Sequence, residues 1–266
     1  MLRVEAQGRV RLVTLDRPAA RNAVNPALAG QLFDAMLEFE ADPDADIAVL
    51  TGAGGAFCAG FDLKAAATGA AEDWIATLDI PEGWTDPIGQ PLASPMGPAR
   101  LMLSKPVIAA IEGPAVAGGM ELALWCDLRV MARDAQMGVF CRRWGVPLID
   151  GGTVRLPMVV GQGRASDLIL TGRPVQAEEA LAIGLADRVV APGGALAAAM
   201  ALAEGLTRFP QACLRADHLS ARLAPEDLAR RLQREWASVR TALAEGVAGA
   251  GRFAAGHGRG GSFADI

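Results

Sequence analysis

Apolar residues in the first half of the chain fall into short runs that alternate with a helical repeat. Residues 10–15, 47–50, 107–111 and 128–131 have the length and composition expected of buried strands. Between the first two runs, apolar residues recur at a spacing of three or four after Asn25-Pro26, a typical helix start. The residues on the apolar face of this helix are Leu28, Leu32, Met36 and Phe39. This alternation of strands and helices predicts an α/β fold.

Residues 66–98 interrupt the alternation. The segment contains Trp74 and Trp84 together with several prolines and glycines. Such a composition is typical of a mobile loop or lid over a site, and a surface insertion without a role is the alternative.

The chain from Ala195 onward has the pattern of helices alone, with Pro210 and Pro225 separating three helical stretches. One apolar face consists of Leu228, Leu232, Trp236 and Val239. This face must pack on the body of the protein or on another subunit. Residues 246–266 are rich in glycine and are expected to be partly disordered. We therefore predict a core over residues 1–194 and a helical oligomerisation region with a flexible tail over residues 195–266.

Charge and hydropathy argue against two classes of partner. The net charge is -5, and the arginine clusters are interspersed with acidic residues, which disfavours nucleic acid and anionic membrane surfaces. The longest apolar stretch, residues 189–203, is shorter than the ~20 residues that span a bilayer. The first residues lack the apolar segment of a signal peptide. We expect a cytoplasmic protein without nucleic-acid or membrane partners.

Cysteine and histidine are too sparse for a metal site. The chain has only two histidines, His218 and His257, and its cysteines show no paired spacing. We expect reduced thiols and no bound metal. The four cysteines are Cys58, Cys126, Cys141 and Cys213.

Two glycine-containing turns, residues 54–63 and 113–122, each follow a predicted buried strand. A helix is expected to begin after each turn, and the free N–H groups at a helix start carry a positive partial charge. A single glycine-rich turn between a strand and a helix is common and does not by itself indicate a site. Two such turns that face one point would form an oxyanion hole.

A series of ordered motifs extends from these turns across the chain. The motifs are residues 15–18 (LDRP), 21–24 (RNAV), 56–63, 105–111, 118–122 (GGMEL), 151–153 (GGT) and 170–172. In this order, over about residues 1–240, the chain resembles the enoyl-CoA hydratase/isomerase family, also called the crotonase superfamily.

The resemblance implies an α/β spiral of ββα units and C-terminal helices that build a trimer or a dimer of trimers. It also implies an acyl-CoA substrate and no cofactor besides the coenzyme A of that substrate. The thioester oxygen would accept hydrogen bonds from the backbone N–H groups of Phe61 and Gly118. The resemblance places along the substrate Arg21, Asn22, Ala23, Val24, Ala59, Asp62, Leu63, Cys141 and Trp144. Asp62 is expected to cap the short helix that follows it.

The acid/base residues depart from the hydratase pattern. Of the two glutamates that hydratases use, the first falls on Glu121, next to the expected oxyanion hole. The alternative is that Glu121 only complements the positive end of its helix. The second falls on Cys141, and a thiol cannot replace a carboxylate at neutral pH without a strongly lowered pKa.

Asp150 is a second candidate carboxylate. Dienoyl-CoA isomerases, which the chain also resembles here, place an aspartate on this turn, whereas an Asp before Gly-Gly-Thr is also a common helix cap. Both interpretations stay open. We expect hydration or double-bond isomerisation of an enoyl-CoA, with Glu121 and Asp150 as the catalytic residues. The alternatives are hydrolysis or decarboxylation of another acyl-CoA, and a non-catalytic acyl-CoA binder.

Overall fold

The computed structural model describes residues 1–67 and 70–258, and it has the predicted α/β architecture. A six-stranded sheet has the order β1-β2-β3-β4-β6-β9. β1 and β2 are antiparallel and all the other neighbours are parallel. The strands are β1 (Leu2–Gln7), β2 (Val10–Leu15), β3 (Ile47–Gly52), β4 (Val107–Ile111), β6 (Leu128–Ala132) and β9 (Arg188–Val190). The four apolar runs of the sequence are therefore four neighbouring strands.

A second sheet brings the two glycine turns together. Its strands are β5 (Pro114–Val116), β7 (Gln136–Gly138) and β8 (Val175–Gln176). Parallel bridges from Cys58 to Ala115 and from Val24 to Phe61 extend this layer toward the N-terminal part of the chain. The first turn thus lies directly beside the second, although about 60 residues separate them.

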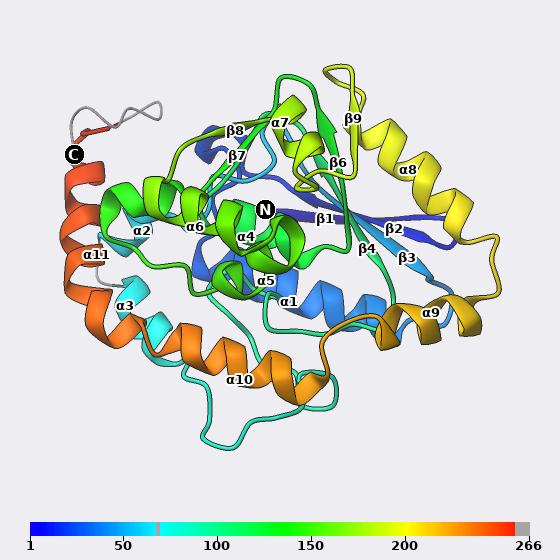
Figure 1. Cartoon of the computed structure of the whole chain (residues 1–266), viewed down its shortest axis with the longest axis horizontal. Coiled ribbons are helices and arrows are strands. Elements are labelled where there is room, and N and C mark those ends of the chain that lie inside the picture. The colour runs from blue at the N-terminus through cyan, green and yellow to red at the C-terminus, as the bar shows by residue number, and fades with distance from the viewer. Residues whose placement is uncertain (68–69, 259–266) are drawn as a thin grey trace.

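Helices surround the two sheets (Figure 1). α8 packs across β2, β3, β4, β6 and β9, and the side chain of Asn25 caps α1 by accepting the N–H of Leu28 at 3.0 Å. The helices before the C-terminal region are α1 (Pro26–Ala41), α2 (Leu63–Ala66), α3 (Ala70–Ala76), α4 (Gly118–Trp125), α5 (Gly152–Val160), α6 (Gln162–Thr171) and α7 (Ala177–Ala182). Two 3-10 helices are η1 (Pro18–Ala20) and η2 (Phe140–Trp144).

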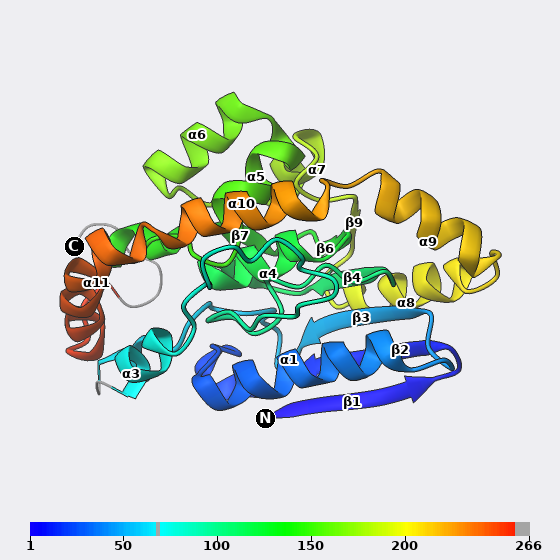
Figure 2. The same cartoon turned by 90° about the horizontal axis from the view of Figure 1, so that it is seen from below.

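The C-terminal region contains four helices rather than the three predicted. They are α8 (Ala195–Leu206), α9 (Gln211–Ser220), α10 (Pro225–Trp236) and α11 (Val239–Ala254). α9 and α10 begin at the two predicted prolines, and the stretch after Pro225 is broken again at residues 237–238. Figure 2 shows α10 running along α5 between α9 and α11.

The expectation of disorder from residue 246 is wrong for residues 246–254, which are helical in α11. The glycines there allow close helix packing. A Cβ atom on Gly249 would lie 1.8 Å from the backbone oxygen of Trp144, so only glycine permits this contact. Residues 259–266 lie outside the described residues.

The segment of residues 66–98 is more than a surface insertion. It contains α3, and the side chains of Trp84 and Met96 are buried, with exposed fractions of 5% and 0%. Trp84 packs in a small apolar cluster with Leu228 and Leu232 of α10. The segment is thus clamped between the core and the C-terminal helices.

Candidate active site

A cavity of about 760 Å³ opens where the two glycine turns meet α4, η2 and α11. Its size is typical of a small-molecule site. The predicted site residues that line it are Arg21, Ala23, Ala59, Phe61, Asp62, Leu63, Gly118, Glu121, Cys141, Trp144 and Asp150. The structure therefore brings together residues from four separate motifs of the chain.

Two predicted substrate residues do not reach this cavity. Asn22 is completely buried, and its side-chain amide donates to the backbone oxygens of Ala53 and Ala56 at 2.8 and 2.7 Å. Val24 is also fully buried and pairs with Phe61 in the bridge between the first turn and the N-terminal loop. Both residues lie behind the lining residues, and their contact with the substrate stays a prediction.

The backbone N–H groups of Phe61 and Gly118 have no hydrogen-bond acceptor within the described part of the chain. The turns that carry them are in direct contact: a Cβ atom on Gly60 would lie 2.9 Å from the backbone nitrogen of Gly118. Gly60 has φ +91°, a conformation that favours glycine. The glycine thus permits both the turn and the close approach of the two donors.

Glu121 extends from the first turn of α4 and is buried, with 3% exposure. One carboxylate oxygen, Oε1, accepts the backbone N–H groups of Asp150 and Gly152, both at 2.9 Å. These bonds fix the side chain against the N-terminus of α5. A carboxyl group held by one oxygen in this way can exchange a proton through the other, which the two bonds do not engage.

Asp150, whose backbone N–H Glu121 accepts, is also buried. Its Oδ1 accepts the backbone N–H of Met96 at 2.9 Å. The cap of α5 is Gly151, in the left-handed region, and no side chain caps from that position. Asp150 therefore does not cap α5, which eliminates the alternative that the sequence leaves open.

The environment divides the two carboxyl groups electrostatically. Burial, reinforced by the nearby charge of Asp150, raises the pKa of Glu121 well above its ordinary value. Burial also raises the pKa of Asp150, but hydrogen bonds from Ser94 and Met96 and the positive charges of Arg100 and Arg155 oppose that rise. Both groups can therefore carry a proton more readily than an exposed carboxyl group.

Cys141 lines the cavity as a neutral thiol. Burial raises its pKa to about 12, and the charge of Glu121 adds to this effect. The nearby Arg142 lowers the pKa too little to create a thiolate at neutral pH. Next to it, Trp144 is packed edge-on against Phe253 of α11, with ring centroids 5.4 Å apart. These apolar groups line the cavity together with the guanidinium group of Arg143.

Cations also line the cavity. Arg17, Arg21 and Lys64 line it. Asp62 caps α2 as predicted, because its Oδ1 accepts the N–H groups of Lys64 and Ala65 at 3.1 and 3.4 Å. Its Oδ2 pairs with Arg17 at 2.9 Å, so this arginine is partly neutralised whereas the Arg21 side chain is exposed.

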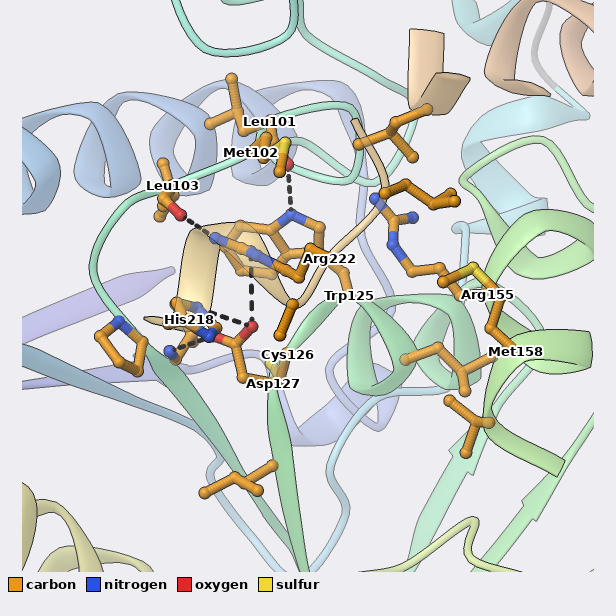
Figure 3. Close-up of a pocket in the computed structure, with 18 of the residues that line it drawn as sticks. Leu101, Met102, Leu103, Trp125, Cys126, Asp127, Arg155, Met158, His218 and Arg222 are labelled. Carbon is orange, nitrogen blue, oxygen red and sulfur yellow. Dashed lines mark hydrogen bonds and ion pairs between the residues drawn. The ribbon is translucent and has the colours of Figure 1, made fainter. Parts of the chain in front are cut away.

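A second cavity, of about 460 Å³, lies between the core and helices α5, α9 and α10 (Figure 3). Its walls are mainly apolar, and Asp127 pairs there with His218 and Arg222 at 3.2 and 3.5 Å. None of the predicted site residues lines it. Arg155, at its edge, donates to the backbone oxygens of Asp150 and Ala99 at 3.2 and 2.7 Å.

Three residues outside the predicted set support the site. Arg100, with 1% exposure, lies over the ring of Trp236 and donates to the backbone of the clamped segment. Met96 provides the N–H that holds Asp150. Glu235, in α10, accepts the N–H of Gly151 at 2.6 Å. Of these three, only Glu235 could have been noticed in the sequence, because it is a charged residue on a helix face that is otherwise apolar.

Comparison with known proteins decides the family. A model described as enoyl-CoA hydratase/isomerase matches residues 5–241. The chain belongs to this family. An enoyl-CoA hydratase of Mycobacterium tuberculosis is 38% identical over 211 residues, 77% of this chain and 73% of the relative. A carnitinyl-CoA dehydratase of Salmonella arizonae is 39% identical over 210 residues, 78% of this chain and 74% of the relative.

Solved structures confirm the crotonase fold of this hydratase/isomerase family member. A carnitinyl-CoA hydratase of Mycobacterium avium superposes with a TM-score of 0.78 at 33% identity, covering 96% of this chain and 95% of that one. An enoyl-CoA hydratase of Mycobacterium tuberculosis gives 0.70 at 36% identity, with 90% of each chain covered. The predicted α/β spiral with a helical C-terminal region is therefore confirmed, whereas the trimer remains a prediction. Among the described residues, no helix is both long and apolar enough to cross a bilayer.

Proposed function

We propose that the protein acts on an enoyl-CoA, stabilising negative charge on the thioester oxygen with the N–H groups of Phe61 and Gly118. In this proposal Glu121 is the principal acid/base residue and Asp150 is the second carboxylate. The observation that carries it is that both carboxyl groups line the same cavity as two backbone N–H groups for which the described residues provide no acceptor. Unpaired donors beside a proton carrier suit a reaction that moves charge onto an oxygen.

The lining of the cavity suits the two parts of an acyl-CoA. Arg21 and Lys64 are exposed cations in it and fit the phosphate groups of coenzyme A. Apolar side chains, among them Met96, Trp144 and Phe253, also line the cavity and fit an apolar acyl group. The reacting carbons would lie next to Glu121 and Asp150.

Hydration of a 2-enoyl thioester would use both carboxyl groups. Asp150 takes a proton from water as the water oxygen forms a bond to the β-carbon, and the π electrons move to the thioester oxygen. The resulting enolate is held by the two N–H groups, and the electrons return as Glu121 gives a proton to the α-carbon. Proton return from Asp150 to Glu121 completes the cycle. The positive charges of Arg100 and Arg155 beside Asp150 favour this division of roles.

Isomerisation of a 3-enoyl thioester needs one carboxylate. Ionised Glu121 would remove a proton from the α-carbon, the charge would pass to the thioester oxygen, and the same proton would return to the γ-carbon. Cys141 takes no part in either route, because burial keeps its thiol neutral. Hydration and isomerisation therefore differ mainly in whether water lies beside Asp150.

The test is turnover of crotonyl-CoA and of a 3-enoyl-CoA of the same chain length, followed by the absorbance of the conjugated thioester. Loss of the signal from the first substrate indicates hydration, and its appearance from the second indicates isomerisation. Calorimetry with the saturated butyryl-CoA measures binding without reaction. Absence of turnover with both substrates, together with no binding of butyryl-CoA at millimolar concentration, would contradict the proposal.

A further inference from the structure

The N-terminus of α5 is held by two carboxyl groups from distant parts of the chain. Glu121 of α4 accepts the N–H groups of Asp150 and Gly152. Glu235 of α10 accepts those of Gly151 and Thr153, at 2.6 and 2.8 Å, and the hydroxyl of Thr153 at 2.7 Å. Four consecutive N–H groups are thus divided alternately between the two glutamates.

We propose that Glu235 is a positioning residue for the acid/base pair, which it serves by holding the turn from Asp150 to Thr153 in place. The inference rests on the proposed function. Glu235 does not line the cavity, so it acts through the turn rather than on the substrate. It replaces the side-chain cap that Gly151, the N-cap of α5, lacks.

Met96 and Arg155 also hold Asp150, but among the described residues only Glu235 accepts the N–H groups of Gly151 and Thr153. Gly151 has φ +89° and no side chain, so its position depends on its backbone contacts. The two carboxylate oxygens of Glu235 accept the N–H groups of Gly151 and Thr153. Glu121 accepts those of Asp150 and Gly152. A shift of this turn would move the backbone of Asp150 and the Oε1 atom of Glu121 together. Glu235 of α10 therefore helps to hold both reacting groups in their positions in the cavity.

Glu235 also interacts electrostatically with Glu121 and Asp150. Three carboxyl groups, from Glu121, Asp150 and Glu235, face two guanidinium groups, from Arg100, which follows the clamped segment, and from Arg155 of α5. Asp79 also faces Arg100, and Arg222 also faces Arg155. The carboxyl groups outnumber the guanidinium groups in this largely buried cluster, so a bound proton lowers its net negative charge.

The three carboxyl groups compete for that proton. Burial raises the pKa of Glu235 to about 7, and the charge of Glu235 in turn helps to raise the pKa of Glu121. Neutralising Glu235 should therefore lower the pKa of Glu121. A purely structural cap would not have this effect on the pH dependence of turnover.

The experiment compares Glu235→Gln with Glu226→Gln, an exposed glutamate on the same helix. For Glu235→Gln we expect kcat to fall by about 10- to 100-fold with KM nearly unchanged, because reacting groups are displaced while the binding surface stays intact. The limb of the pH profile that reports Glu121 should move to lower pH. Glu226→Gln should match the wild type in both respects.

Amide hydrogen exchange gives a readout that needs no substrate. Exchange at Gly151 and Thr153 should be slow in the wild type and faster in Glu235→Gln, with Glu226→Gln unchanged. Thr153→Val, which removes one donor and keeps the charge, provides a milder variant if Glu235→Gln folds poorly. It should lower kcat in the same direction and by less.

Three outcomes separate the two proposals. An active wild type whose kcat, pH profile and amide exchange are all unaltered in Glu235→Gln would overturn the role of Glu235 alone. A lower kcat that only follows a lost folded fraction, with an unshifted pH profile, would also overturn it. A wild type inert toward every thioester would overturn the proposed function, and the exchange rates would still decide whether Glu235 holds the turn.

Discussion

The carboxylate of Glu121 accepts the backbone N–H of Asp150 at 2.9 Å, so the two candidate acid/base residues are bound directly to each other. This bond connects the first turn of α4 to the turn before α5. It holds the backbone of Asp150, while the N–H of Met96 holds its carboxylate. The replacement of the second hydratase glutamate by Cys141 is therefore compensated by a carboxyl group from a neighbouring turn in our account.

Asp150→Asn should lower kcat by about 100-fold or more, because an amide cannot take a proton from water. Cys141→Ala should retain most of the turnover, since the thiol stays neutral at the pH of the assay. Both residues line the cavity, so each variant serves as the control for the other. An inactive Cys141→Ala beside an active Asp150→Asn would assign the second role to the thiol.

Gly60→Ala should abolish most of the turnover by forcing the two donor turns apart. The added Cβ atom would lie 2.9 Å from the backbone nitrogen of Gly118, in a conformation with φ +91°. Gly8→Ala is the matched control, because Gly8 also has a positive φ but has open space around it. Both variants should lose about 1 kcal/mol of unfolding free energy from backbone strain.

Chemical denaturation of Gly60→Ala and Gly8→Ala measures the backbone strain that both variants share. Steady-state kinetics then shows the effect of the contact between the two turns, which only Gly60→Ala disturbs. Comparable loss of turnover in the two variants would mean that the approach of the donors is not what matters. Loss in Gly60→Ala alone would indicate that the contact between the turns positions the N–H groups.

The stability of the protein should depend on pH through Glu235. Its folded pKa of about 7 lies above the ordinary 4.5, so the folded state binds more protons between these values. The corresponding stability is fully present below pH 4.5 and is lost as the pH rises through 7, on the order of 3 kcal/mol. Denaturant titrations at pH 5 and pH 8 measure it.

In Glu235→Gln the difference in unfolding free energy between pH 5 and pH 8 should change by this amount relative to the wild type. Glu226→Gln is again the control and should behave as the wild type does. Equal differences in all three proteins would show that Glu235 titrates normally in the folded state.

The protein should form a trimer or a dimer of trimers, as its relatedness to the family suggests. Large apolar side chains remain exposed on the single chain, among them Met158, Leu170 and Phe209, with exposed fractions of 52%, 75% and 57%. Their burial between subunits would remove apolar surface from water. Light scattering at micromolar concentration measures the mass, and a monomer would contradict this prediction.

Local patterns predicted the parts of the fold that depend on neighbouring residues. Apolar runs became β2, β3, β4 and β6, and Asn25 begins α1 because both signals act over a few residues. The glycine-rich stretch of α11 was misjudged, because its glycines serve a contact with Trp144 that lies about 100 residues earlier. Helix propensity alone cannot reveal such packing.

The candidate site shows the same limit. The motifs located Glu121, Phe61 and Gly118 in the chain, and all three line the cavity. The role of Asp150 depended on whether it caps α5, and that is decided by backbone geometry at Gly151. The bond from Gly151 to Glu235 spans 84 residues, so no local pattern contains it.

The central claim is that Glu121 transfers the proton on a thioester held by Phe61 and Gly118. The most direct test is kcat for Glu121→Gln with its preferred enoyl-CoA, together with calorimetric binding of the saturated analogue. Glu112→Gln is the matched control, because Glu112 also accepts two backbone N–H groups, at 3.0 and 2.8 Å, but lies outside the cavity. We predict a loss of about 100- to 10,000-fold in kcat for Glu121→Gln, unchanged binding, and wild-type behaviour for Glu112→Gln. Turnover by Glu121→Gln within a few-fold of the wild type would contradict the account.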